Sequence, residues 1–265
     1  MRRLPNYNPV EHTPRLETNN RTAEMIKYAS NALQATLISF ANEIASVCST
    51  HEELDAMDVM RGVHLMNEIT PVTESGERKT APIAKFLSPG CGFGGSCFPK
   101  DVAAIVANAR DRGVPMQLLE SVQAINKKQP LKLLEMAEQS LGSLKGKRVA
   151  VLGLAFKAGT DDLRETPAIP IVRALADRGA TVVAFDPQVH EIKLPLVLAS
   201  SMEEAVGGAD AVLLVTAWPQ FKELPAVIAR QAKPPVLIDG RRFIKPDAVK
   251  SYKGIGVSFG QGEMQ

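Results

Sequence analysis

The sequence predicts an α/β protein whose helical first half is followed by a parallel β-sheet with helices on both of its faces. Residues 21–140 carry apolar side chains at helical spacing, whereas residues 141–265 alternate short apolar strands with helical segments. Such alternation is typical of parallel strands joined by crossover helices. We therefore expect a tail or linker at residues 1–20, a helical domain at 21–140 and a sheet domain at 141–265.

Composition favours small-molecule partners. The 265 residues are 45% hydrophobic, and 31 basic and 29 acidic residues give a net charge of +2 without a basic patch. This balance predicts neither nucleic-acid binding nor attraction to a membrane surface. The longest uncharged helical stretch, Tyr28–Asn42, is shorter than the roughly 20 residues of a membrane span. The basic start, Met1–Arg3, precedes no apolar segment, so no secretory signal is predicted.

The cysteines indicate a reduced protein without a metal site. Cys48, Cys91 and Cys97 are odd in number and form no Cys-x-x-Cys pair. A disulfide framework and a zinc site are therefore not indicated, and a cytoplasmic location fits best.

Helices fill most of the first domain. The first, from Arg21 to about Cys48, is apolar around much of its axis, so it must be buried within a domain or between subunits. Lys27 and Asn31 lie four residues apart and share one face of this helix. The other predicted helices lie within residues 50–70, at about Val102–Arg112 and over Leu118–Ala137, where Pro130 kinks or restarts the helix.

A glycine-rich segment, Gly90–Asp101, lies between these helices. Its glycines allow positive φ and bring main-chain N–H groups close to a ligand, and an apolar helix begins just after Cys97. Cations and a helix start lower the pKa of a thiol, and Lys100 and Asp101 supply charge and proton transfer nearby. Cys97 is thus a candidate nucleophile, whereas Cys91 reads as a small buried hydrophobe.

Strands in the second domain alternate with helices such as Ala168–Asp177, and ligands of such sheets bind at the carboxyl ends of the strands. Phe156 and Lys157, Ala217–Pro219, and Asp239–Arg242 are expected there. Gly153-Leu154-Ala155 is not the Gly-x-Gly-x-x-Gly dinucleotide fingerprint, so the sheet alone predicts only a binding function. The predicted strands are 147–156, 180–185, 210–216 and 235–238.

Three motifs resemble the UDP-glucose/GDP-mannose dehydrogenase family. The family signature Gly-x-Gly-Gly-Ser-Cys-x-x-Lys-Asp matches Gly92–Asp101 throughout. Two further matches lie at Ala23–Ala32 and at Gly153–Lys157 followed by Thr160–Glu165. The resemblance covers nearly everything after residue 20 and implies a helical central domain that forms a homodimer, followed by a Rossmann-like UDP-binding domain.

The resemblance also implies roles for single residues. Cys97 would capture an aldehyde, Lys27 would stabilise the oxyanion with Asn31, and Asp101 would guide the water that releases the acid. Phe93, Gly94, Gly95, Phe156, Lys157 and Arg241 would bind the substrate. Arg164 and Lys100 would contact NAD. Asp161, Asp162 and Glu165 read as structural residues of their loop.

The implied activity is the NAD-dependent, two-step oxidation of UDP-glucose to UDP-glucuronate. Ser88 stands where some UDP-glucose enzymes carry lysine, and Arg78 is the nearest substitute for an Asp-Pro-Arg element. These departures leave glucose, mannose and N-acetyl sugars open. The family's N-terminal NAD-binding domain has no counterpart in this sequence, so we expect little turnover without a separate NAD-binding domain. Alternatives are a non-catalytic nucleotide-sugar-binding or dimerisation module, and a thiol redox sensor built on Cys91 and Cys97.

Overall fold

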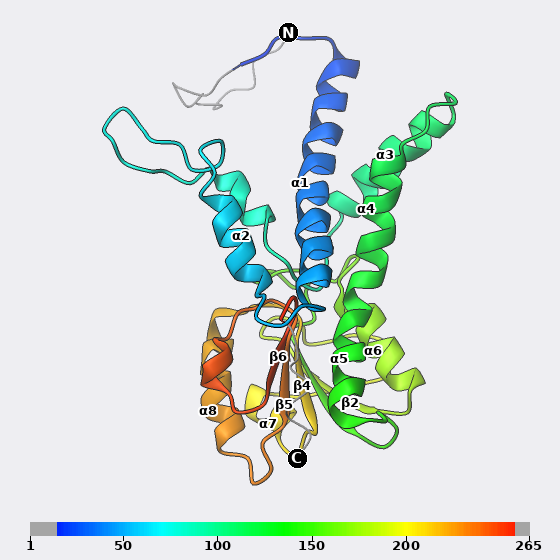
Figure 1. The fold of residues 1–265 in the computed structure, drawn as a ribbon. Coiled ribbons are helices and arrows are strands. Elements are labelled where there is room, and N and C mark those ends of the chain that lie inside the picture. Colours follow the sequence, from blue (N-terminus) through cyan, green and yellow to red (C-terminus); the bar gives the residue numbers. More distant parts are fainter. Residues whose placement is uncertain (1–14, 258–265) are drawn as a thin grey trace, which may run out of the picture.

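A computed structural model describes residues 15–257 and shows helices standing on one end of a parallel sheet (Figure 1). The predicted fold class is confirmed. Residues 15–19 lack regular secondary structure, as expected for the tail, while predictions that concern residues 1–14 and 258–265 lie outside the described residues.

Helix α1 (Asn20–Cys48) is the axis of the helical half. Asn19 caps it by accepting a hydrogen bond from the Thr22 N–H, and its 29 residues span about 44 Å. Its buried side is lined by small residues such as Ala35 and Ala41, which let neighbouring helices approach closely. Those neighbours are α2 (Ala56–His64), α3 (Phe98–Arg110) and α4 (Gln117–Lys128).

The helix predicted within residues 50–70 is shorter in the structure. Asp55 caps α2 through the Met57 N–H, so this helix begins only at Ala56. It ends at His64, and the chain runs on as an exposed loop that bridges Val72 and Arg78. The predicted interruption at Pro130 is confirmed, because a 3₁₀ turn, Gln129–Leu131 (η2), separates α4 from α5 (Lys132–Leu141).

The sheet contains six parallel strands in the order β3-β2-β1-β4-β5-β6. Helices α5 and α6 pack together on one face, and α7 and α8 pack together on the other. The edge strands β3 and β6 were not predicted, because two or three residues give too short a pattern to recognise. The strands are β1 (Arg148–Leu152), β2 (Thr181–Phe185), β3 (Val197–Leu198), β4 (Ala211–Leu214), β5 (Val236–Asp239) and β6 (Tyr252–Gly254). The helices are α6 (Ala168–Asp177), α7 (Met202–Val206) and α8 (Leu224–Ala229).

One side of α1 carries apolar residues that the rest of residues 15–257 leaves about half exposed. Ile26, Leu33, Phe40 and Val47 follow one another at intervals of seven residues and are 44–55% exposed. Residues seven apart lie on nearly the same side of a helix, so these four form a continuous stripe, the α1 stripe. The burial predicted for α1 is therefore seen on one side of the helix, while the α1 stripe on another side is about half exposed.

Candidate functional site

The candidate site begins at Cys97, which forms the N-cap of α3. Pro99 occupies the first turn, where its missing N–H costs nothing. The Cys97 side chain is exposed, and its sulfur lies 3.9 Å from the Ser96 hydroxyl. Cys91 is fully buried, with its thiol directed at the Val215 carbonyl oxygen 3.4 Å away. Burial of Cys91 agrees with the small hydrophobe predicted there, while Cys97, the predicted nucleophile, is exposed.

Asp101 lies in the first turn of α3 and gathers the polar residues of α1 around it. Its carboxylate is fully buried, and one oxygen, Oδ2, accepts from Lys27 Nζ at 3.0 Å and from Asn31 Nδ2 at 2.6 Å. The other oxygen accepts from Lys100, whose ammonium group also lies over the Tyr28 ring. The predicted shared face of Lys27 and Asn31 therefore converges on one carboxylate.

Asp101 should remain ionised down to strongly acidic pH. Burial raises its pKa, but hydrogen bonds from Lys100, Lys27 and Asn31 outweigh that effect and lower the pKa to about 2. Because the pKa is lower in the folded state, this carboxylate stabilises the fold above about pH 4, and the contribution is lost as the pH falls towards 2. Carbon-13 NMR of the Asp101 carboxyl group is expected to show a midpoint near 2, and a midpoint near 4 would contradict the cluster.

Three side-chain amides hold the backbone of the glycine-rich loop. Asn126 on α4 accepts from the Phe93 N–H at 2.8 Å and donates to the Phe93 carbonyl at 3.0 Å. Gln129 donates to the Gly90 carbonyl, and Asn42 on α1 accepts from the Gly90 N–H, both at 2.8 Å. Because a loop cannot satisfy these groups within itself, the amides fix its shape.

The middle of the loop packs directly on the segment that follows β1. The Gly95 N–H donates to the Arg164 carbonyl at 2.8 Å. A Cβ atom at Gly94 would lie 2.2 Å from the Glu165 carbonyl oxygen, and one at Gly95, where φ is +79°, would lie 2.8 Å from the Phe156 ring. The glycines predicted to bind substrate therefore also allow two backbone segments to touch.

Arg241 joins the loop to the carboxyl end of the sheet. Its Nε donates to the Val215 carbonyl after β4 at 2.6 Å, and its Nη1 donates to the Gly92 carbonyl at 3.2 Å. A cavity of about 280 Å³ opens here, lined by Phe93, Gly94, Phe156 and Arg241 among others. It lies near β1 and β4, where the strand order reverses and sheets of this type bind ligands. Lys157 does not line the cavity; it is exposed, with its ammonium group over the Phe156 ring.

Arg164 contacts the cysteine loop through its carbonyl oxygen, which accepts from the Gly95 N–H. Its guanidinium forks onto Asp162, with Nη2 and Oδ2 separated by 2.7 Å, which lowers the pKa of Asp162 to about 2. Hydrogen bonding to Asp162 raises the pKa of Arg164, and charge at Cys97 adds a smaller increase. The pKa of Lys100 is raised in the same way, mostly by its hydrogen bond to Asp101 and to a smaller extent by charge at Cys97. Both cations thus lie within the electrostatic reach of the Cys97 sulfur.

Several residues of this site were not predicted. Asn42, Asn126 and Gln129 carry the loop. Asp239 belongs to a segment expected at the strand ends, but its role in shaping the turn that carries Arg241 was not predicted. Their signal in the sequence is faint: amides three or four residues from apolar positions in a helix, and an acid at the end of a strand. Asp186, just after β2, accepts from four backbone N–H groups and from Trp218 Nε1. It is a turn former with its lone pairs already occupied.

Native thiol labelling should distinguish Cys97 from the other cysteines. Cys48 and Cys91 are 3% and 0% exposed, and burial raises the pKa of both. Brief treatment with iodoacetamide is therefore expected to modify Cys97 alone, and all three cysteines after unfolding. Peptide mass spectrometry reads the positions, and fast labelling of Cys91 in the folded chain would contradict the burial described.

Neither a membrane span nor a metal centre is found among residues 15–257. No helix in this part of the chain combines the length and the apolar content needed to cross a bilayer. The same residues hold no group of three or more His, Cys, Asp or Glu side chains that could hold a metal ion.

Comparison with known proteins supports the resemblance. Residues 21–128 match the central domain of the UDP-glucose/GDP-mannose dehydrogenase family, and residues 150–246 match its UDP binding domain. UDP-glucose 6-dehydrogenase TuaD of Bacillus subtilis is 39% identical over 92% of this chain and 52% of its own. UDP-glucose 6-dehydrogenase AglM of Haloferax volcanii is 40% identical over 87% and 51%. The chain spans about half the length of the curated relatives it matches.

Solved structures lead to the same family. The UDP-glucose dehydrogenase of Pyrobaculum islandicum is 32% identical, with a TM-score of 0.78 over 92% of this chain and 53% of that one. The UDP-D-ManNAc dehydrogenase of Pyrococcus horikoshii is 30% identical, with a TM-score of 0.70 over 90% and 53%. Both domain matches occur in sequence order, and the cysteine loop lies within the first of them, so this chain belongs to the UDP-glucose/GDP-mannose dehydrogenase family and spans its central and UDP-binding domains.

Proposed function

We propose that this chain is the substrate-binding and cysteine-bearing part of a UDP-sugar 6-dehydrogenase that oxidises UDP-glucose to UDP-glucuronate. The observation that carries the proposal is the convergence of Cys97, the Lys27 and Asp101 cluster and Arg241 on one loop. The loop joins a nucleophile to cations that suit a diphosphate and a developing oxyanion. The UDP binding domain supports UDP as the nucleotide.

Cys97 supplies the covalent step. Its sulfur adds to the C6 aldehyde, forming a C–S bond while the carbonyl π electrons become an alkoxide. Loss of a hydride from this adduct leaves a thioester, and attack by water breaks the C–S bond and returns the thiolate with the acid product. Lys27 is 60% exposed and held only through its ammonium group, so it can turn towards the oxyanion in both tetrahedral states.

The role proposed for Asp101 requires a rearrangement. A carboxylate with a pKa near 2 is a weak base while two ammonium groups hold it. When substrate draws Lys27 away, Asp101 loses one of these partners and its pKa rises. Asp101 can then take the proton of the water that attacks the thioester, while Asn31 keeps the carboxylate oriented.

We propose that NAD binds at the rim of this site, beside the cysteine loop, and not at the start of α6 on the sheet. The start of α6 offers no phosphate cradle, because Pro167 and Pro170 lack N–H groups and Thr166 accepts those of Ala168 and Ile169. Arg164 and Lys100, beside Cys97, are the residues of this chain that would face the cofactor. Oxidation of an alcohol to an acid releases two hydrides, and two NAD molecules bound there in succession would each accept one of them. We propose that a separate NAD-binding domain completes the site.

Calorimetry with UDP-glucose tests the proposal. We expect weak binding by the chain, weaker still after Lys157→Ala and Arg241→Ala, and no binding of free glucose. UDP-N-acetylmannosamine is the competing ligand, because the structural relatives include an enzyme named for that sugar. If the chain binds neither nucleotide sugar, the proposal is wrong. Adding an NAD-binding domain of a relative in trans, with Cys97→Ser as control, then separates an enzyme from a non-catalytic module.

We also propose that the chain dimerises through the α1 stripe. Four apolar residues at intervals of seven form a surface that a second helix can cover. Leu33→Asp and Phe40→Asp are expected to convert a dimer into a monomer in sedimentation-equilibrium experiments, because each places a charge in the apolar seam. Leu118→Asp, an exposed apolar position outside the stripe, is the matched control. Dimers that persist in both stripe variants would contradict this interface.

A further inference from the structure

Two consecutive arginines just after β5 contact different parts of the molecule. Arg241 reaches the glycine-rich loop at the Gly92 carbonyl, whereas Arg242 reaches the helical half at Asp55. Arg242 has a φ of 51°, a conformation that costs a residue with a side chain some energy. The turn therefore needs outside contacts to hold this shape, and they come from two carboxylates.

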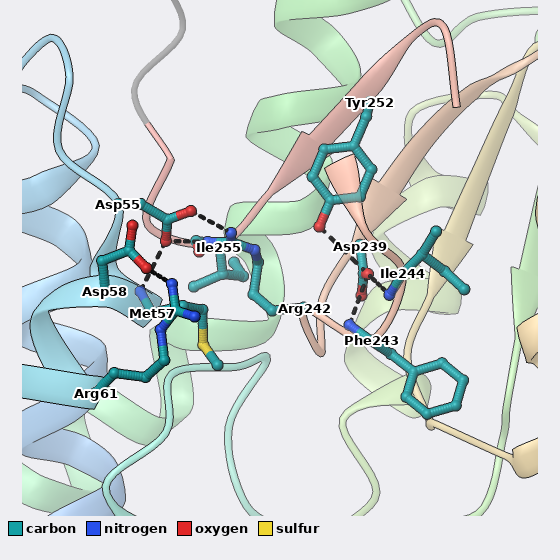
Figure 2. Close-up of polar contacts among 10 residues, drawn as sticks. All are labelled: Asp55, Met57, Asp58, Arg61, Asp239, Arg242, Phe243, Ile244, Tyr252 and Ile255. Atoms are coloured by element: carbon teal, nitrogen blue, oxygen red, sulfur yellow. Dashed lines mark hydrogen bonds and ion pairs between the residues drawn. The ribbon is translucent and has the colours of Figure 1, made fainter. Parts of the chain in front are cut away.

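The first carboxylate is Asp239, whose contacts with Phe243, Ile244 and Tyr252 are drawn in Figure 2. It is fully buried and accepts the Arg241 N–H at 2.9 Å and the N–H groups of Phe243 and Ile244 at 2.8 Å. The Tyr252 hydroxyl adds a longer bond of 3.3 Å. These bonds fix the backbone on both sides of Arg242.

The second carboxylate is Asp55, which holds the Arg242 side chain (Figure 2). The guanidinium forks onto it, with 2.6 Å between Nη2 and Oδ2 and 2.9 Å between Nη1 and Oδ1, and the Arg242 side chain is only 4% exposed. Burial raises the pKa of Asp55, but hydrogen bonds from Arg242 and Met57 outweigh it and lower the pKa. Such bidentate pairs fix direction as well as distance.

The same contact ties the two halves of the molecule. The Ala56 N–H donates to the Gly256 carbonyl at 2.9 Å, and Arg242 Nη1 donates to the Ile255 carbonyl at 3.0 Å. On the other side of the turn, the Cys91 N–H donates to the Gly240 carbonyl at 2.9 Å. A displacement of Arg242 would therefore reach both Arg241 and the cysteine loop.

We propose that Arg242 and Asp55 are positioning residues for Arg241 and the cysteine loop. The pair anchors the turn to the start of α2, so that Arg241 points into the cavity while its backbone stays in register with the loop. This inference rests on the proposed function, because Arg241 is assigned there to the nucleotide. Neither Arg242 nor Asp55 lines the cavity of about 280 Å³, so they act through Arg241 rather than by contact with the substrate.

Asp55→Asn tests the proposal with little damage to the helix. Asparagine caps helices as well as aspartate does, so α2 keeps its cap while the charged fork is lost. Glu138→Gln removes another ion pair that joins separate elements, Arg178 to Glu138 at 2.7 Å, and is the matched control. We expect Asp55→Asn to weaken UDP-glucose binding about fivefold and Glu138→Gln to leave it unchanged.

A double-mutant cycle shows whether the effect passes through Arg241. If it does, adding Asp55→Asn to Arg241→Ala should weaken binding no further than Arg241→Ala alone. A purely structural role would give additive losses, and these would overturn the proposal, as would unchanged affinity in Asp55→Asn.

Hydrogen exchange separates this inference from the proposed function. In Asp55→Asn the N–H groups of Arg241 and Cys91 are expected to exchange about tenfold faster, while those of β1 keep their rates. If the unaltered chain binds neither UDP-glucose nor UDP-N-acetylmannosamine, the proposed function is wrong, and the exchange rates still decide whether the pair holds the turn. Unchanged rates at Arg241 and Cys91 would overturn it.

Discussion

Gly94→Ala is expected to abolish detectable UDP-glucose binding and to destabilise the chain by about 2–3 kcal/mol, as overpacking does. The new methyl group would lie 2.2 Å from the Glu165 carbonyl oxygen, far inside van der Waals contact. Neither side can move easily, because Glu165 holds a φ of 51° and the adjacent Gly95 N–H is bonded to Arg164. A displaced loop is expected to lose two hydrogen bonds to the bound substrate. At about 1.5 kcal/mol each, this weakens affinity on the order of 100-fold.

Gly62→Ala is the matched control for this change. Gly62 lies within α2, and no atom lies within 4 Å of the place that an added methyl group would take, so alanine should be neutral or slightly stabilising. Calorimetry gives the affinities and urea unfolding gives the stabilities. Wild-type affinity in Gly94→Ala would show that the loop does not need its contact with Glu165, and the site described above would be wrong.

Local patterns predicted much of this molecule. The 29 residues of α1, the break at Pro130 and the four longer strands all have apolar periodicity or a breaker that acts within a few residues. The loop motif placed Cys97 correctly at a helix start. Four-residue spacing placed Lys27 and Asn31 on one helix face, and the family resemblance made them site candidates, but only the structure shows that both meet Asp101.

The contacts between the halves were beyond sequence reasoning. Arg242 and Asp55 are separated by 187 positions, and Arg241 and Gly92 by 149. Nothing in the local pattern of Arg241-Arg242 tells which arginine faces the cavity, because that depends on the positive φ of Arg242. The residues of the loop could be predicted from its motif. The amides and carboxylates that hold the loop in place come from distant elements and could not.

Asp239→Ala is expected to cost about 3–5 kcal/mol of folding free energy. The side chain is fully buried, and removing it leaves the N–H groups of Arg241, Phe243 and Ile244 without their acceptor, each worth about 1–3 kcal/mol when stranded. Asp239→Asn should cost less folding free energy than Asp239→Ala. The amide oxygen of asparagine can still accept backbone N–H groups, although its NH₂ group would face other donors and could not bond to them. The order is therefore wild type, then asparagine, then alanine.

Urea unfolding at pH 7 measures these costs, with Asp247→Ala as the control. Asp247 is exposed in the next turn of the chain, and its removal should change stability by less than about 0.5 kcal/mol. The expected loss also has a second consequence: because the turn carries Arg241, Asp239→Asn should bind UDP-glucose more weakly even where it is fully folded. If both Asp239 variants unfold like Asp247→Ala, the carboxylate does not hold this turn, and the geometry assigned to Arg241 has to come from the loop alone.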